Sequence, residues 1–173
     1  MSKAELKKTL TRMSKEEIIG MVTEMYDVRP EAKEYLEYWL NPDADAELER
    51  RKEMVNDMHF FRSGKLRRAP TATELKRVVK DFETLCYDPE KVADLLVYIA
   101  DASLRWVVYG LKTQAAPRKA LERNIGNARE YVEKSDLEGV YGLRLDRMEE
   151  AMREYYNNPP EPPRRGRRRW YRW

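Results

Sequence analysis

Apolar residues recur every three or four positions along most of this chain, and this spacing predicts α-helices. Each apolar stripe then forms one helix face, which we expect to be buried. Three such stripes are Ile18, Met21, Val22 and Met25; Leu75, Val78, Val79 and Phe82; and Leu145, Met148, Met152 and Tyr155. The predicted helices cover residues 2–11, 14–26, 30–40, 43–61, 72–86, 89–113, 117–134 and 142–157. No strand-like alternation of useful length interrupts them.

Signals for helix starts agree with these ranges. A capping box places a hydroxyl just before the helix and a carboxylate three positions later, so that each satisfies a backbone N–H group of the other. Three pairs fit this pattern: Ser2 with Glu5, Ser14 with Glu17, and Thr71 with Glu74. Prolines suited to the first position of a helix stand at 30, 89 and 117.

The connections between these helices are short, and short connections make antiparallel αα-hairpins. Two junctions look alike, because Tyr-Asp at 26–27 and at 87–88 is followed by Pro-Glu at 30–31 and at 89–90. Residues 89–113 are apolar on more than one face and are predicted to form a central helix. We therefore predict an all-α fold. It would be one helical domain over residues 1–157, a compact array of αα-hairpins arranged as a bundle or a short solenoid, with a disordered basic tail over 158–173.

The net charge of +3 conceals an asymmetry along the chain. Six of the 34 bases and one of the 31 acids lie at Pro159 or beyond, so this tail carries a charge of +5. The rest of the chain holds 28 bases and 30 acids, a net charge of −2. A nearly neutral body does not by itself indicate nucleic-acid binding.

The sequence has no long uncharged apolar run, and no apolar stretch follows its first lysines. We expect neither a membrane-spanning helix nor a secretory signal on these grounds. The single cysteine, Cys86, cannot form an internal disulfide. Since that fits a reducing compartment, we expect a cytoplasmic protein.

Residue types that serve metal sites and nucleophilic catalysis are scarce. His59 is the one histidine and Cys86 the one cysteine, too few for a structural zinc site. The acids of residues 43–49 alternate as in a calcium loop, but Leu48 and Met54 stand where glycine and glutamate are needed, so we interpret the acids as a helix start. No glycine-rich phosphate loop or nucleophile elbow occurs. We expect no catalytic residue, no metal and no cofactor, and we interpret Cys86 as a core residue.

A cluster of bases over residues 62–80, the basic island, is the first candidate binding site. It contains a single acid, Glu74, and follows Phe60 and Phe61. Clustered bases beside an aromatic ring are typical of proteins that bind a phosphate backbone. The alternative is a solvated loop whose charges keep the protein soluble. The bases are Arg62, Lys65, Arg67, Arg68, Lys76, Arg77 and Lys80.

The aromatic segment over residues 31–40 is the second candidate. The helical spacing puts Tyr35, Leu36, Trp39 and Leu40 on one face, which we expect to enter the core, and Tyr38 at its side. Aromatic clusters also anchor protein interfaces. Tyr38 and Trp39 are therefore the candidate surface for a protein partner.

The C-terminal tail is the third candidate. Its four prolines favour an extended spacer. The arginines and aromatic residues that follow could bind nucleic acid, lie at an anionic membrane surface, or contact a protein through cation–π interactions. A solvated tail without a partner is the remaining alternative. The candidate residues are Arg164, Arg165, Arg167, Arg168, Arg169, Trp170, Tyr171, Arg172 and Trp173.

Residues 1–43 resemble the opening of a bacterial family of small helical proteins of unknown function. The shared pattern is a lysine-rich short helix, a Ser-Lys-Glu-Glu start at 14–17, and a Lys-Glu-Tyr-Leu-Glu helix at 33–37 that ends in Leu-Asn-Pro-Asp at 40–43. The resemblance implies an intracellular bacterial protein without an assigned activity. It transfers no catalytic residues.

Taken together, these features predict a non-enzymatic interaction protein whose helical surface binds an unidentified protein partner. The alternative is DNA or RNA binding through the basic island and the tail together. A third alternative is peripheral association with a membrane through the tail.

Overall fold

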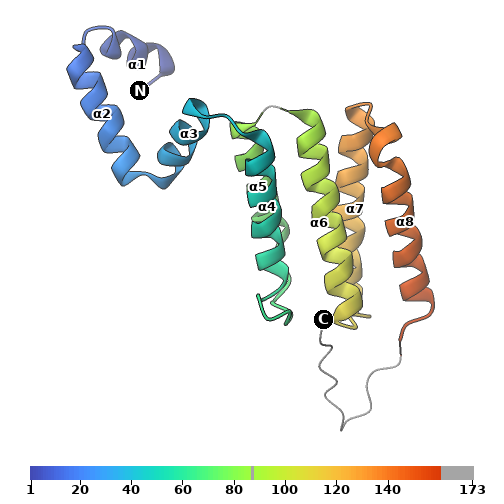
Figure 1. The fold of residues 1–173 in the computed structure, drawn as a ribbon. Coiled ribbons are helices and arrows are strands. Elements are labelled where there is room, and N and C mark those ends of the chain that lie inside the picture. The colour runs from blue at the N-terminus through green and yellow to red at the C-terminus, as the bar shows by residue number, and fades with distance from the viewer. Residues whose placement is uncertain (87, 161–173) are drawn as a thin grey trace. The chain divides into compact units, whose positions relative to one another are not determined.

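The computed structural model describes residues 1–86 and 88–160, and helices make up the regular structure of this part of the chain. Within these residues, one isolated β-bridge pairs Phe60 with Leu66. The all-α prediction is confirmed, while the predicted tail lies outside the described residues from Glu161 onward. The helices are α1 (Lys3–Leu10), α2 (Lys15–Val28), α3 (Pro30–Leu40), α4 (Ala44–His59), α5 (Ala72–Leu85), α6 (Pro89–Tyr109), α7 (Ala115–Lys134) and α8 (Glu138–Asn157) (Figure 1).

All three predicted capping boxes form. At the start of α2, the backbone N–H of Glu17 donates to Ser14 Oγ at 3.1 Å, and the backbone N–H of Ser14 donates to Glu17 Oε2 at 2.7 Å. These hydrogen bonds hold the pKa of Glu17 below its ordinary value. The same exchange starts α1 at Ser2 and α5 at Thr71. Helix starts were therefore predictable from residues three positions apart.

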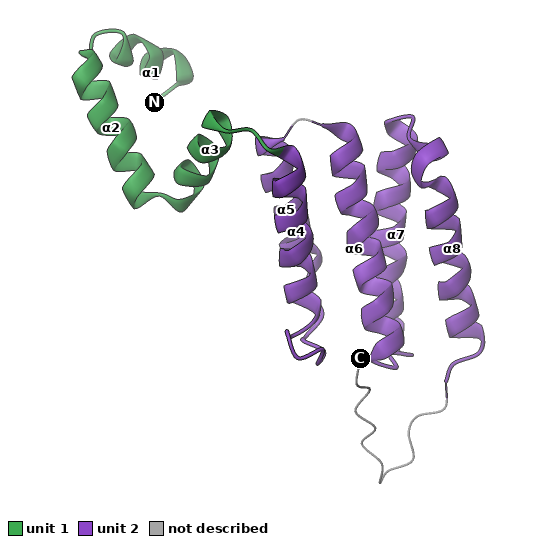
Figure 2. Cartoon of the chain, viewed as in Figure 1, with its two compact units in different colours: residues 1–43 green, residues 44–173 purple. Residues whose placement is uncertain are grey.

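The chain divides into two compact units, Met1–Asp43 and a second that begins at Ala44 (Figure 2). Unit 1 consists of α1, α2 and α3, and α2 packs against α3. Tyr26 Oη donates to Glu37 Oε1 at 2.8 Å between these two helices.

None of residues 1–43 is fully buried, which corrects two predictions for unit 1. Met25, on the predicted buried stripe of α2, is 46% exposed. On α3, Tyr35, Trp39 and Leu40 were expected in the core but are 46%, 68% and 66% exposed. The physical reason is size, because a unit of three short helices has too little chain to enclose every apolar face.

Unit 2 is a five-helix bundle built around α6. Figure 1 shows α6 between α4 and α8, with α5 and α7 behind them, and α6 contacts all four neighbours. The predicted central position of residues 89–113 is thus confirmed. The core includes Val97, Val107, Leu121, Ile125 and Leu145, all at most 2% exposed.

Two helix boundaries differ from the prediction because of left-handed backbone at the connections. Helix α6 ends at Tyr109 instead of residue 113, since Leu111 has a φ of 50° and the Lys112 N–H turns back to Val107 O at 2.9 Å. Helix α8 begins at Glu138 instead of residue 142, two residues after Asp136, whose φ is 55°. Each tight turn ends one helix and starts the next within a few residues.

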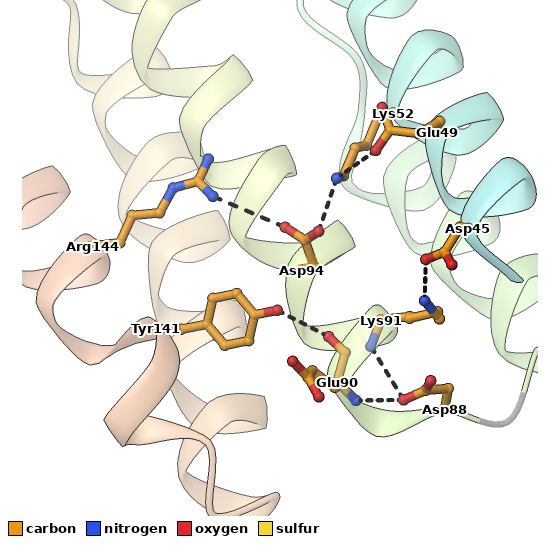
Figure 3. A network of polar contacts seen from close by, with 9 residues as sticks. All are labelled: Asp45, Glu49, Lys52, Asp88, Glu90, Lys91, Asp94, Tyr141 and Arg144. Atoms are coloured by element: carbon orange, nitrogen blue, oxygen red, sulfur yellow. Dashed lines mark hydrogen bonds and ion pairs between the residues drawn. The ribbon is translucent and has the colours of Figure 1, made fainter.

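A polar network fastens α4 and α8 to the first half of α6 (Figure 3). Asp94 of α6 lies 2.8 Å from Lys52 Nζ of α4 and 3.9 Å from Arg144 Nη1 of α8. Burial opposes the charge of Lys52, but hydrogen bonds from its ammonium group to Asp94 and Glu49 outweigh burial and raise its pKa. Asp94 is therefore an ionic link between three helices.

The start of α6 adds further links in the same network (Figure 3). Asp88 caps the helix by accepting from the backbone N–H of Glu90 at 3.0 Å. Lys91 pairs with Asp45, which lies in the first turn of α4. Tyr141 of α8 donates to the carbonyl oxygen of Glu90 at 3.3 Å. The acids around residue 45 thus start a helix, as predicted, and Asp45 also reaches α6.

Candidate functional site

All seven bases of the basic island are exposed. Among these bases, Arg68 lies 3.6 Å from Glu74 and Arg77 lies 3.6 Å from Asp81. The Arg67 guanidinium lies over the ring of Phe61, 4.4 Å from its centroid. Phe61 is itself 47% exposed. The loop therefore presents a guanidinium stacked on an aromatic ring to solvent.

Four of the seven bases of the island line two different hollows. The first has a volume of about 360 Å³ beside the loop and is lined by Phe61, Arg67, Arg68 and Glu74 together with Met58, Ala69 and Pro70. The second lies on the far side of α5, where Lys76 and Lys80 line a separate groove. A basic run that is continuous in sequence is thus divided between a loop hollow and a helical groove.

The second hollow, the basic groove, has a volume of about 280 Å³. Its apolar floor is Leu75 and Val79 of α5 with Leu96 and Ile99 of α6. Its charged rim is Lys76 and Lys80 of α5, Arg123 of α7 and one acid, Glu83. Ala72, Asn124, Asn127 and Tyr131 complete the lining.

An interior polar chain joins α4, α6 and α7. It consists of His59, Ser103 and Asn124, which are 2%, 7% and 7% exposed. Asn124 Nδ2 donates to Ser103 Oγ at 2.9 Å, and Ser103 Oγ lies 3.4 Å from His59 Nε2. On the other side of the ring, His59 Nδ1 lies 2.9 Å from the carbonyl oxygen of Val55.

These contacts determine where the proton of the His59 ring lies. A carbonyl oxygen only accepts, so Nδ1 of His59 carries the proton and Nε2 is left as an acceptor. The single hydroxyl proton of Ser103 has two acceptors within reach, the carbonyl oxygen of Ile99 at 2.8 Å and Nε2 of His59 at 3.4 Å. Burial, aided by the positive charge of Arg105, lowers the pKa of His59 below its ordinary value. The imidazole is therefore neutral near neutral pH.

A cavity of about 230 Å³ adjoins the interior polar chain. His59, Ser103 and Asn124 form its polar wall, and the rest of the lining includes Trp106 and Leu121. Asn124 also lines the basic groove, so it borders both spaces. The members of the interior polar chain contact one another and the backbone carbonyl oxygens of Val55 and Ile99, and such networks hold helices in register.

The other predicted site residues are placed as follows. Tyr38 is half-buried and Trp39 is 68% exposed. Cys86 is buried with 4% exposure, in agreement with its interpretation as a core residue. Every tail candidate, from Arg164 to Trp173, lies outside the described residues.

Sequence reasoning missed Arg123 and Asn124, which complete the groove and the polar chain from α7. Asn124 did leave a signal, because it interrupts the apolar stripe formed by Leu121, Ile125 and Ala128. A polar residue on a buried stripe indicates an interior hydrogen bond. Arg123 left none, since an exposed base on a helix looks like ordinary surface charge.

Comparison with protein families adds one match, to DUF6155, a family of unknown function, over residues 1–161. The chain belongs to the DUF6155 family. No curated protein and no solved structure matches the chain. The predicted membership of a family of unknown function is confirmed, and the DUF6155 match extends well beyond the residues 1–43 that suggested it.

Membership of DUF6155 assigns no role to any residue, so the candidate surfaces depend on geometry alone. In residues 1–86 and 88–160, no helix is both long and apolar enough to cross a membrane. The same residues contain no group of three or more His, Cys, Asp or Glu placed to share a metal ion.

Proposed function

We propose that this DUF6155 protein is a non-enzymatic interaction protein that binds a protein partner through α3. The observation that supports this is the exposure of Tyr35, Trp39 and Leu40, which we call the α3 apolar face. Trp and Tyr side chains are enriched among the residues that dominate binding energy at interfaces. Tyr38, half-buried at the side of this face, belongs to the same proposed surface.

A comparison within the chain shows how unusual this exposure is. Trp106 of α6 is 9% exposed and donates its indole N–H to the carbonyl oxygen of Arg67 at 2.9 Å. Trp39, with 68% exposure, leaves most of its ring in water. Covering apolar area is favourable by about 25 cal/mol per Å². A partner that covers Trp39 and Leu40 would gain this free energy.

The experiment captures partners of the full chain from a lysate treated with nuclease, and identifies them by mass spectrometry. Leu40→Asp tests the α3 apolar face, and Leu143→Asp on α8 is its matched control, because the two leucines are 66% and 65% exposed. We expect the complex to persist with Leu143→Asp and to be lost with Leu40→Asp. A complex that both variants retain would contradict the proposal.

Nucleic-acid binding is a second candidate function, favoured by the stacking of Arg67 on the exposed ring of Phe61. The proposal predicts retardation of DNA or RNA in a gel that weakens steeply as salt rises. It also predicts loss of retardation in Arg67→Glu/Arg68→Glu, and weakening on deletion of residues 159–173. Arg147→Glu, at an exposed base of α8, is the control. Absence of retardation at low salt would exclude this function.

The bacterial origin and the cytoplasmic location remain predictions. The first is implied by the resemblance of residues 1–43, and the second is supported by the single, buried cysteine. Fractionation of cells that express the full chain would test the location.

A further inference from the structure

The basic groove is a separate feature in unit 2, independent of the α3 apolar face. It forms because α5 and α7 both pack against α6 and leave part of α6 between them as a floor. Leu96, half-buried, belongs to that floor, and Val79 beside it on α5 is also half-buried. Apolar side chains thus remain accessible at the bottom of a charged rim.

The cations of the rim have no partner among residues 1–86 and 88–160. In the part of the chain that the structure describes, Lys76, Lys80 and Arg123 have no ion pair or hydrogen bond from their charged groups. Neighbouring bases elsewhere are paired, as Arg77 is with Asp81 and Arg118 with Glu122. Three cations on two opposing helices therefore face one hollow with a single acid, Glu83, on its rim.

This charge distribution favours an anionic ligand. Lys76 and Lys80 are one helical turn apart on α5, and Arg123 approaches from α7. Hydrogen bonds between a carboxylate and charged donors are about twice as strong as neutral ones. An anion between the two helices would also offset the mutual repulsion of the three cations.

The lining of the groove suits a narrow apolar chain. The groove has a volume of about 280 Å³, just below the range of roughly 300–1,000 Å³ that is usual for small-molecule sites, so it suits a small ligand. An extended alkyl chain is narrow and would lie along Leu75, Val79, Leu96 and Ile99.

We propose that the basic groove binds an anionic amphiphile, namely a straight-chain carboxylate. Its carboxylate would lie among Lys76, Lys80 and Arg123, and its alkyl chain would cover the floor between α5 and α7. Binding requires both the carboxylate and the alkyl chain of the ligand, since the rim supplies charge and the floor supplies apolar area.

The test titrates the full chain with sodium decanoate below its micelle concentration, by calorimetry and by NMR. Three compounds are controls. Acetate carries the carboxylate without the alkyl chain, and inorganic phosphate is an anion without one. Decyltrimethylammonium carries the alkyl chain with the opposite charge. We expect saturable binding of decanoate only, with amide shifts in α5, α6 and α7. Equal binding of acetate, phosphate or the cationic amphiphile would overturn the proposal, as would no binding of decanoate.

Variants locate the site. Lys76→Gln/Arg123→Gln removes two rim charges and should weaken decanoate binding by at least about tenfold, as expected for charge-assisted hydrogen bonds. Its control is Lys119→Gln/Arg147→Gln, which removes two exposed bases outside the groove. These substitutions are at the surface and should leave stability within about 0.5 kcal/mol. Equal affinity in the two double variants would place any binding elsewhere and refute the assignment.

Discussion

The side-chain amide of Asn124 donates a 2.9 Å hydrogen bond to the hydroxyl of Ser103, which joins α7 to α6 inside the bundle. Both side chains are 7% exposed, so water does not readily replace either partner. We expect Ser103→Ala and Asn124→Leu each to lower the free energy of unfolding by about 1–3 kcal/mol. The double variant should lose less free energy of unfolding than the two single variants lose in sum, by about 0.5–3 kcal/mol. Urea unfolding of the four proteins measures this coupling, and strict additivity would contradict it.

The interior polar chain also predicts a dependence of stability on pH. Burial lowers the pKa of His59 from 6.5 in the folded state, so the unfolded chain takes up its proton first as pH falls. Stability should be full above about pH 6.5 and should fall at lower pH, by at most about 1.4 kcal/mol per pH unit. Below the folded pKa this loss levels off.

The control for this pH dependence is His59→Gln. This variant should be less stable at neutral pH. Its free energy of unfolding should change less between about pH 5 and 7, since it has no imidazole to titrate. Glu17, Glu74 and Glu130 titrate below this window because hydrogen bonds hold their pKa values below 4.5. An unchanged slope in the variant would show that other groups cause the pH effect.

Asp94 should stabilise the bundle more than an exposed ion pair does. Asp94→Asn removes a charge that is 24% exposed and that pairs with Lys52, itself 16% exposed. We expect the free energy of unfolding to fall by about 1–2 kcal/mol. Glu130→Gln is the control, because its pair with Lys134 is 65% and 71% exposed and should have no measurable effect. Equal thermal shifts in both variants would be inconsistent with a role for Asp94 as an interhelical link.

Two glycines should respond in opposite directions to alanine. A Cβ at Gly110 would lie 2.8 Å from Leu66 Cδ1 and 2.8 Å from the carbonyl oxygen of Trp106. Gly110→Ala should therefore destabilise the fold by about 1–3 kcal/mol. Gly126, inside α7, has nothing within 4 Å of such a Cβ, and Gly126→Ala should stabilise by about 0.5–1 kcal/mol. Thermal unfolding of both variants is the measurement, and destabilisation by both would contradict this account.

Helix positions could be predicted from the sequence because their signals are local. The exchange between Ser14 and Glu17 spans three residues and forms as expected. The stripe of Leu75, Val78 and Phe82 is buried as expected. Boundaries were less predictable at Leu111 and Asp136, because the left-handed position of each turn is held by a residue other than glycine.

Burial was harder to predict than helicity. The stripe with Tyr35, Trp39 and Leu40 resembles the stripe on α5, yet one is exposed and the other is in the core. A stripe shows that one helix face is apolar, whereas its burial depends on what packs there. That depends on the number and length of the helices in each unit, and unit 1 has only three short ones.

The candidate site was predictable only in part, for the same reason. Lys76 and Lys80 stood out as bases close in sequence, but Arg123 joins them from 43 residues beyond Lys80 because α5 and α7 share α6 as a neighbour. By itself the sequence determined the helices and their starts, since backbone capping and side-chain periodicity act over three or four residues. The tertiary structure decided which apolar faces are covered, which polar groups meet and where cations gather, because these depend on contacts between helices that are distant in sequence.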